Sequence, residues 1–66
     1  MATIEIIAFR IKELETTFTK DYAVQGQILL GWLTIRKFSA SKASEKELWW
    51  AQACAQNLLD ELNKEQ

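Results

Sequence analysis

The chain is nearly without the residues that form tight turns. Among its 66 residues there is no proline, and the only glycines are Gly26 and Gly31. The two asparagines, Asn57 and Asn63, fall within a C-terminal stretch that has helical periodicity. An all-β domain of this size needs several tight turns, which glycine, asparagine, aspartate and proline usually form. The scarcity of these residues therefore predicts an all-α fold.

Apolar side chains recur every three or four residues along the chain, which is the spacing of one helix face. In the first segment these side chains are Ile4, Ile7, Ile11, Leu14 and Phe18. We expect one small domain over residues 1–66, with three helices at about 3–18, 20–38 and 45–64. A chain this short buries only about 60% of its surface, so dimerisation is one way to complete its core.

The first two segments also fit β-strands. Ile7, Phe9 and Ile11 alternate with other residues, and residues 28–35 form an uncharged apolar run that would suit a buried strand. The alternative is therefore an α+β fold, in which an N-terminal β-hairpin is followed by a C-terminal helix.

The C-terminal segment carries the clearest helix signals. Residues 39–44 are rich in serine and are expected to form a short linker. Ser44 and Glu47 then have the spacing of a capping box, in which each satisfies a free backbone N–H at the start of a helix. One face of this predicted helix is apolar and carries Leu48, Ala51, Ala55, Leu58, Leu59 and Leu62.

The composition argues against catalysis. Histidine is absent and Cys54 is the only cysteine, so the commonest general base and the commonest metal ligand are both missing. We therefore predict no catalytic residue, no metal site and no cofactor.

Cysteine usage and hydropathy also bear on location. A small chain with one cysteine has no internal disulfide, which suits a reducing compartment and predicts a cytoplasmic protein. No basic region followed by a long apolar run begins the chain, so we expect no signal peptide. The longest apolar stretch is shorter than the roughly 20 residues that span a bilayer, so no membrane partner is expected.

Trp49 and Trp50 are the most informative pair of residues. Adjacent residues on a helix point about 100° apart, so the two rings cannot face the same core. Exposed tryptophan is enriched among the residues that dominate protein–protein binding. The alternative is that Trp50 packs with Cys54 against a neighbouring helix while Trp49 lies along the surface. We predict a partner-binding surface that consists of Trp49, Trp50, Ala53, Trp32 and Leu30.

These observations predict a small non-enzymatic protein-binding module that acts as an inhibitor or adaptor of a larger protein or complex. Phages and mobile elements encode inhibitors of bacterial defence complexes that have this profile. A homodimer is a further arrangement expected of such a protein.

The alternative function is a small nucleic-acid-associated regulator. Arg36, Lys37 and Lys42 would contact phosphates in such a protein. The simpler interpretation of Arg36 and Lys37 is that they stabilise a helix end, where cations suit the helix dipole. The formal net charge of −1 and a pI of about 5.3 argue against nucleic acid as the main ligand.

Overall fold

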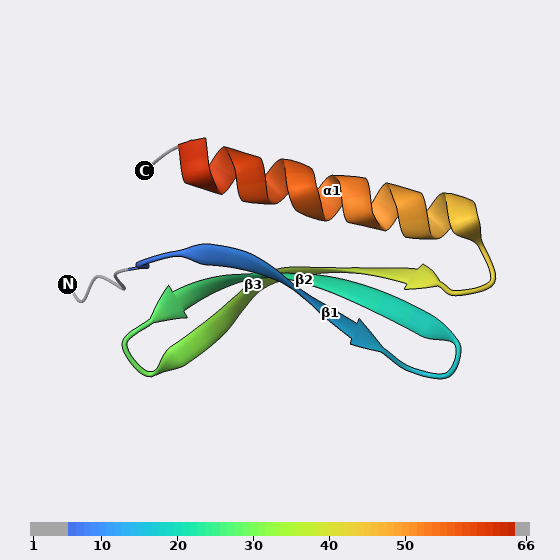
Figure 1. Ribbon diagram of the computed structural model, residues 1–66, viewed down its shortest axis with the longest axis horizontal. Helices are drawn as coiled ribbons and strands as arrows, with labels where there is room; N and C mark the ends of the chain where they lie inside the picture. Colours follow the sequence, from blue (N-terminus) through green and yellow to red (C-terminus); the bar gives the residue numbers. More distant parts are fainter. Residues whose placement is uncertain (1–5, 65–66) are drawn as a thin grey trace.

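The computed structural model describes residues 6–64 and contains three strands followed by one helix (Figure 1). The strands are β1 (Phe9–Glu15), β2 (Thr19–Ile28) and β3 (Gly31–Ser41), and the helix α1 spans Glu45–Lys64. The strands form one antiparallel sheet in the order β1-β2-β3, so β2 is the central strand. Within residues 6–64, no helix has the length and apolar character that crossing a bilayer would require.

The sheet is strongly twisted. Val24 on β2 pairs with Ile11 on β1 and with Arg36 on β3, but the next β2 residue, Gln25, pairs with Thr34. Ile35 is therefore the extra residue of a β-bulge, a feature that increases the local twist. Figure 1 shows this twist: the strands cross one another, and the β2–β3 hairpin turns away from α1.

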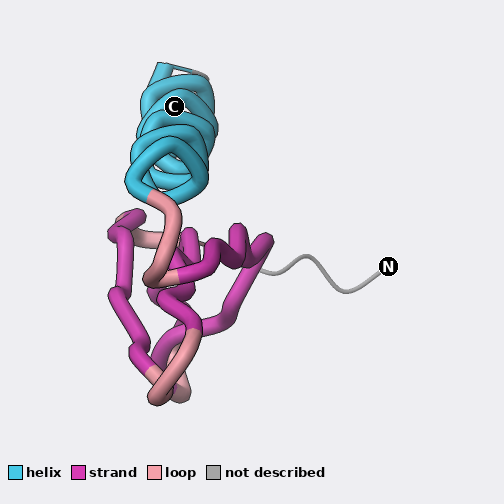
Figure 2. Tube along the Cα trace, turned by 90° about the vertical axis from the view of Figure 1, so that its right-hand side faces the viewer, coloured by secondary structure: helices cyan, strands magenta, loops and turns pink. Residues whose placement is uncertain are grey.

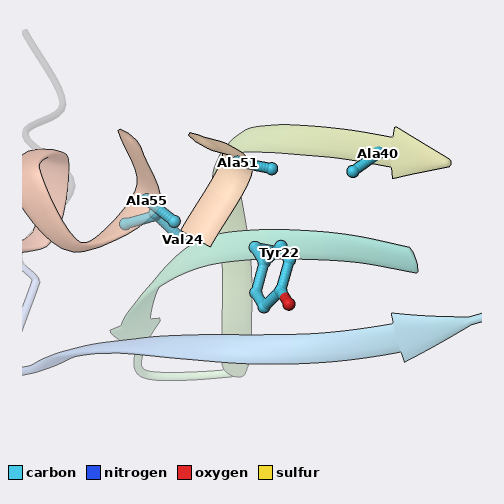
Figure 3. Close-up of a cluster of buried hydrophobic side chains, with 5 residues drawn as sticks. All are labelled: Tyr22, Val24, Ala40, Ala51 and Ala55. Atoms are coloured by element: carbon cyan, nitrogen blue, oxygen red, sulfur yellow. The ribbon is translucent and has the colours of Figure 1, made fainter. Parts of the chain in front are cut away.

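The helix packs along one side of the sheet (Figure 2). The buried cluster between them consists of Tyr22, Val24, Ala40, Ala51 and Ala55 (Figure 3). Three of these five side chains are alanines, and small side chains allow two elements to approach closely. Val24 is the largest fully buried side chain among the described residues. The rim of the cluster is formed by Ile11, Phe38, Leu48, Leu58 and Leu62.

The helix predicted over residues 45–64 is present as α1. Ser44 caps its first turn, since its hydroxyl oxygen accepts a hydrogen bond from the Glu47 backbone N–H at 3.2 Å. The backbone N–H of Ser44 donates to the carbonyl oxygen of Ser41 at 3.1 Å. Only one half of the predicted capping box is therefore formed, and a turn at the end of β3 supplies the partner for the other N–H.

The predicted all-α fold is wrong, because the chain is α+β. The segment predicted as a helix over 3–18 contains β1 and a turn, with residues 3–5 outside the described part. The segment predicted as a helix over 20–38 contains β2, a turn and most of β3. The alternative of one hairpin followed by a helix comes nearer, but it lacks the third strand. That strand includes Ser39–Ser41, which were expected to be part of a linker.

The two hairpins need few of the usual turn residues, which is why the turn-residue argument failed. In the β1–β2 turn the Thr16 hydroxyl oxygen accepts a hydrogen bond from the Thr19 backbone N–H at 3.0 Å. In the β2–β3 turn, Gly31 takes the positive backbone angle, with φ at 141°. No described non-glycine residue has a positive φ, so the φ angles of Leu29 and Leu30 are both negative. A hydroxyl and one glycine thus replace the asparagine and proline that turns commonly use.

We expect Ala51→Leu to lower the free energy of unfolding by about 1–3 kcal/mol, because the added carbons would overfill the contact between α1 and the sheet. Urea denaturation followed by circular dichroism measures this change. Gln52→Leu is the matched control, since Gln52 is exposed and the same substitution there should change stability by about 0.5 kcal/mol or less. Equal midpoints for the two variants would contradict packing through Ala51.

Candidate functional site

Trp49 and Trp50 both lie on the side of α1 that faces away from the sheet. Ala51 and Ala55 point toward the strands and are fully buried. At about 100° per residue, Trp49 lies about 140° and Trp50 about 120° from the midpoint between those two alanines. Trp49 is 72% exposed and Trp50 57% exposed. Trp50 therefore does not pack into the core, and neither ring contributes to the buried cluster.

The two tryptophans border a shallow hollow on the helix surface. The hollow has a volume of about 210 Å³ and is lined by Lys46, Glu47, Trp49 and Trp50. Long side chains on a helix lean toward its N-terminus, which places both rings over the preceding turn. Ala53 lies four residues after Trp49 and three after Trp50, and it is half-buried on the same outward side of α1. The predicted residues Trp49, Trp50 and Ala53 thus form one surface, which we call the tryptophan surface.

Trp32 and Leu30 do not belong to the tryptophan surface. They lie on the β2–β3 hairpin, whose turn is at the opposite end of the molecule from the start of α1 (Figure 1). The Trp32 ring is covered on one side by the Arg10 guanidinium, which lies 3.9 Å from the ring centroid. The five predicted binding residues therefore separate into two groups.

A short polar network supports Trp32 on the sheet face opposite α1. The Arg10 Nε donates to the Gln25 Oε1 at 2.9 Å, and the Gln25 Nε2 donates to the Thr34 Oγ1 at 3.2 Å. The network crosses all three strands, so it fixes the position of the guanidinium that covers Trp32. Trp32 consequently has a clear structural role in addition to its partial exposure.

Several exposed apolar residues were not among the predicted binding residues, and Leu29 and Phe18 are the most exposed of them. Leu29 is 95% exposed beside Leu30, which is 93% exposed, at the tip of the β2–β3 hairpin. Phe18 is also largely exposed, in the β1–β2 turn. Its carbonyl oxygen accepts a hydrogen bond from the Lys42 backbone N–H, so it lies at the same end of the molecule as the start of α1. Gly31, which takes a positive φ, is the residue that could have indicated a turn here, but no signal in the sequence indicated that the leucines beside it are exposed.

The three basic residues predicted to contact phosphates are not brought together. Arg36 and Lys37 are neighbours on β3 and therefore point to opposite faces of the sheet. The Arg36 guanidinium lies 5.1 Å from the centroid of the Phe38 ring, and the Lys37 Nζ lies 3.8 Å from a carboxylate oxygen of Asp21. Neither residue forms a common cationic surface with Lys42.

Lys42 holds the β1–β2 turn against the segment before α1. Its Nζ lies 3.2 Å from both the Glu15 Oε2 and the Thr16 carbonyl oxygen. Lys20 extends this cluster, because its Nζ lies 2.8 Å from the Glu13 Oε1 and 3.6 Å from the Glu15 Oε1. The cluster is a network of alternating charges and has the geometry of a structural tie.

No group of side chains in the described part of the chain suggests a metal site. Within residues 6–64, no three histidine, cysteine, aspartate or glutamate side chains are grouped so as to hold a metal ion. Cys54, the one cysteine, is half-buried and does not form a disulfide. No family model, curated protein or solved structure matches the chain.

We expect Glu15 to titrate below its usual range, because the hydrogen bond from Lys42 lowers the pKa of its carboxyl, with further help from the charges of Lys42 and Lys20. A lowered pKa in the folded state means that the interaction stabilises the fold at neutral pH and is lost as pH falls through that pKa. A carbon-13 NMR titration of the glutamate carboxyls measures the pKa of Glu15. Lys42→Met should raise the Glu15 pKa, whereas the control Lys37→Met should not, since Lys37 pairs with Asp21.

Proposed function

We propose that this chain is a small non-enzymatic protein-binding module that acts as an inhibitor or adaptor of a larger protein or complex through its tryptophan surface. The observation that carries the proposal is the joint exposure of Trp49 and Trp50 around an apolar hollow. Two adjacent tryptophans that contribute nothing to the core reduce the solubility of a free protein, so their presence needs another explanation.

The chemistry of the tryptophan surface suits a protein partner. Tryptophan is among the residues most enriched at binding hot spots, where a ring fills a desolvated pocket and neighbouring side chains exclude water. Lys46 and Glu47 border the rings with opposite charges, so the rim offers polar contacts without a strong net field. A rim of this kind around an apolar centre is the usual anatomy of a protein–protein interface.

The absence of histidine supports a role without catalysis, and a single cysteine supports a cytoplasmic setting. Small inhibitors encoded by phages and mobile elements share this size and composition. A bacterial defence complex is therefore the class of partner to test first.

We expect Trp49→Ala/Trp50→Ala to abolish capture of the partner without unfolding the chain. Proteins that co-purify with the tagged chain from its host would be compared between the wild type and this variant, and the protein lost would be purified. Removing two hot-spot rings should weaken its affinity about 30-fold or more, which corresponds to about 2 kcal/mol. Isothermal titration calorimetry measures the affinity, and circular dichroism checks the fold.

Asn57→Ala is the matched control, because Asn57 is exposed on the same outward side of α1 and is small and polar. This variant should capture the same protein with affinity close to that of the wild type. If the double tryptophan variant also captures every partner of the wild type with unchanged affinity, the tryptophan surface is not the binding site and the proposal is wrong.

A further inference from the structure

The outer half of the β2–β3 hairpin exposes a second apolar surface, distinct from the tryptophan surface. We call it the apolar arm, and it consists of Ile7, Leu29, Leu30, Leu33 and Ile35. All five side chains are at least 40% exposed. Ile7 belongs to the arm because its backbone N–H donates to the carbonyl oxygen of Gln27, which places it beside the hairpin. The side chains of the arm are all aliphatic.

The two leucines at the tip are not required by the turn. Gly31 takes the positive φ, so Leu29 and Leu30 occupy backbone conformations that almost any residue can adopt. Polar residues are the common choice at such positions, since the side chains point into water. Nearly complete exposure of both leucines therefore has no explanation in the fold of one chain.

The core of one chain is also small for the amount of apolar surface that it leaves uncovered. Within residues 6–64 the buried hydrophobic residues are mostly alanines, and Val24 is the largest that is fully buried. Domains of this size often complete their cores by association. From these observations we infer that the apolar arm is a homodimer interface, in which the arm of a second copy of this chain covers it.

The charge distribution favours a second copy as the occupant. A two-fold interface places a surface patch against the same patch of its partner, so any charged residue near the axis would face its own charge. Residues 28–35 contain no charged residue, and the chain has a formal net charge of only −1. Stable interfaces bury roughly 800 Å² per partner, and the nearly complete exposure of Leu29 and Leu30 supplies an apolar centre for such an interface.

A lipid surface fits the apolar arm less well. Segments that insert into membranes usually carry cationic side chains that contact anionic headgroups. The two arginines nearest the arm already have partners in the fold, because the Arg10 guanidinium is stacked on Trp32 and that of Arg36 lies over Phe38. The five side chains of the arm themselves include no cation.

The position of the arm leaves the tryptophan surface accessible. The β2–β3 turn lies at one end of the molecule, and α1 begins at the other (Figure 1). A dimer formed through the arm would therefore present two tryptophan surfaces at its outer ends. Such a protein would bind a partner with two copies of its site more tightly than one chain does, since the second contact becomes intramolecular.

Sedimentation equilibrium of the whole chain tests the inference. We expect the wild type to reach twice its mass of 7.6 kDa with rising concentration. Leu29→Asn/Leu30→Asp should be monomeric and folded, because asparagine and aspartate suit a β-turn. Leu33→Lys is a second variant outside the turn and should weaken the dimer at least tenfold. The control Trp49→Ala should dimerise as the wild type does.

A wild type that stays monomeric at millimolar concentration would overturn the inference, as would a tip variant and a Leu33→Lys variant that both dimerise normally while circular dichroism shows them folded. Flotation with phosphatidylcholine and phosphatidylserine vesicles identifies the alternative occupant. A monomeric chain that floats with vesicles uses the arm on lipid, and one that does not float leaves the arm to a different protein. Either result rejects a second copy.

Discussion

The contact of Ala51 and Ala55 with Val24 and Tyr22 determines how the rest of the molecule is arranged. Because the two alanines are small, α1 lies close to the sheet and its rotation about its own axis is fixed. That rotation turns Trp49 and Trp50 outward, and within residues 6–64 no second helix lies beside α1 to cover its flanks. The exposure of the tryptophans therefore follows from the position of the small apolar side chains on α1, because that face packs on the sheet.

The twist of the sheet has the corresponding effect at the other end of the molecule. The bulge at Ile35 and the long β2–β3 hairpin carry the hairpin tip away from α1, so one helix cannot cover the full length of the strands. The apolar residues beyond its reach stay exposed, although they belong to strands that are well paired. Small side chains are thus buried while several large ones are exposed, which reverses the usual distribution in a free-standing domain.

The sequence predicted α1 correctly because its signals are local. Ser44 provides the cap, and the apolar face from Leu48 to Leu62 packs on the sheet as its spacing indicated. The all-α prediction missed the strands because the turns between them have weak sequence signals. One turn depends on the Thr16 hydroxyl and the other on a single glycine, Gly31. The exposure of at least one tryptophan followed from the rotation of about 100° between neighbouring residues. The exposure of both follows because α1 is the one helix within residues 6–64, which only the fold reveals.

The two exposed surfaces differ in ways that suit different partners. The tryptophan surface is aromatic, hollowed and bordered by Lys46 and Glu47, so it offers directional and charged contacts that distinguish one partner from another. The apolar arm is aliphatic and uncharged, and it offers mainly apolar burial with little to select a foreign surface. A surface without selective contacts distinguishes poorly between partners, so it suits a partner that is always present together with the chain. Another copy of the chain meets that condition.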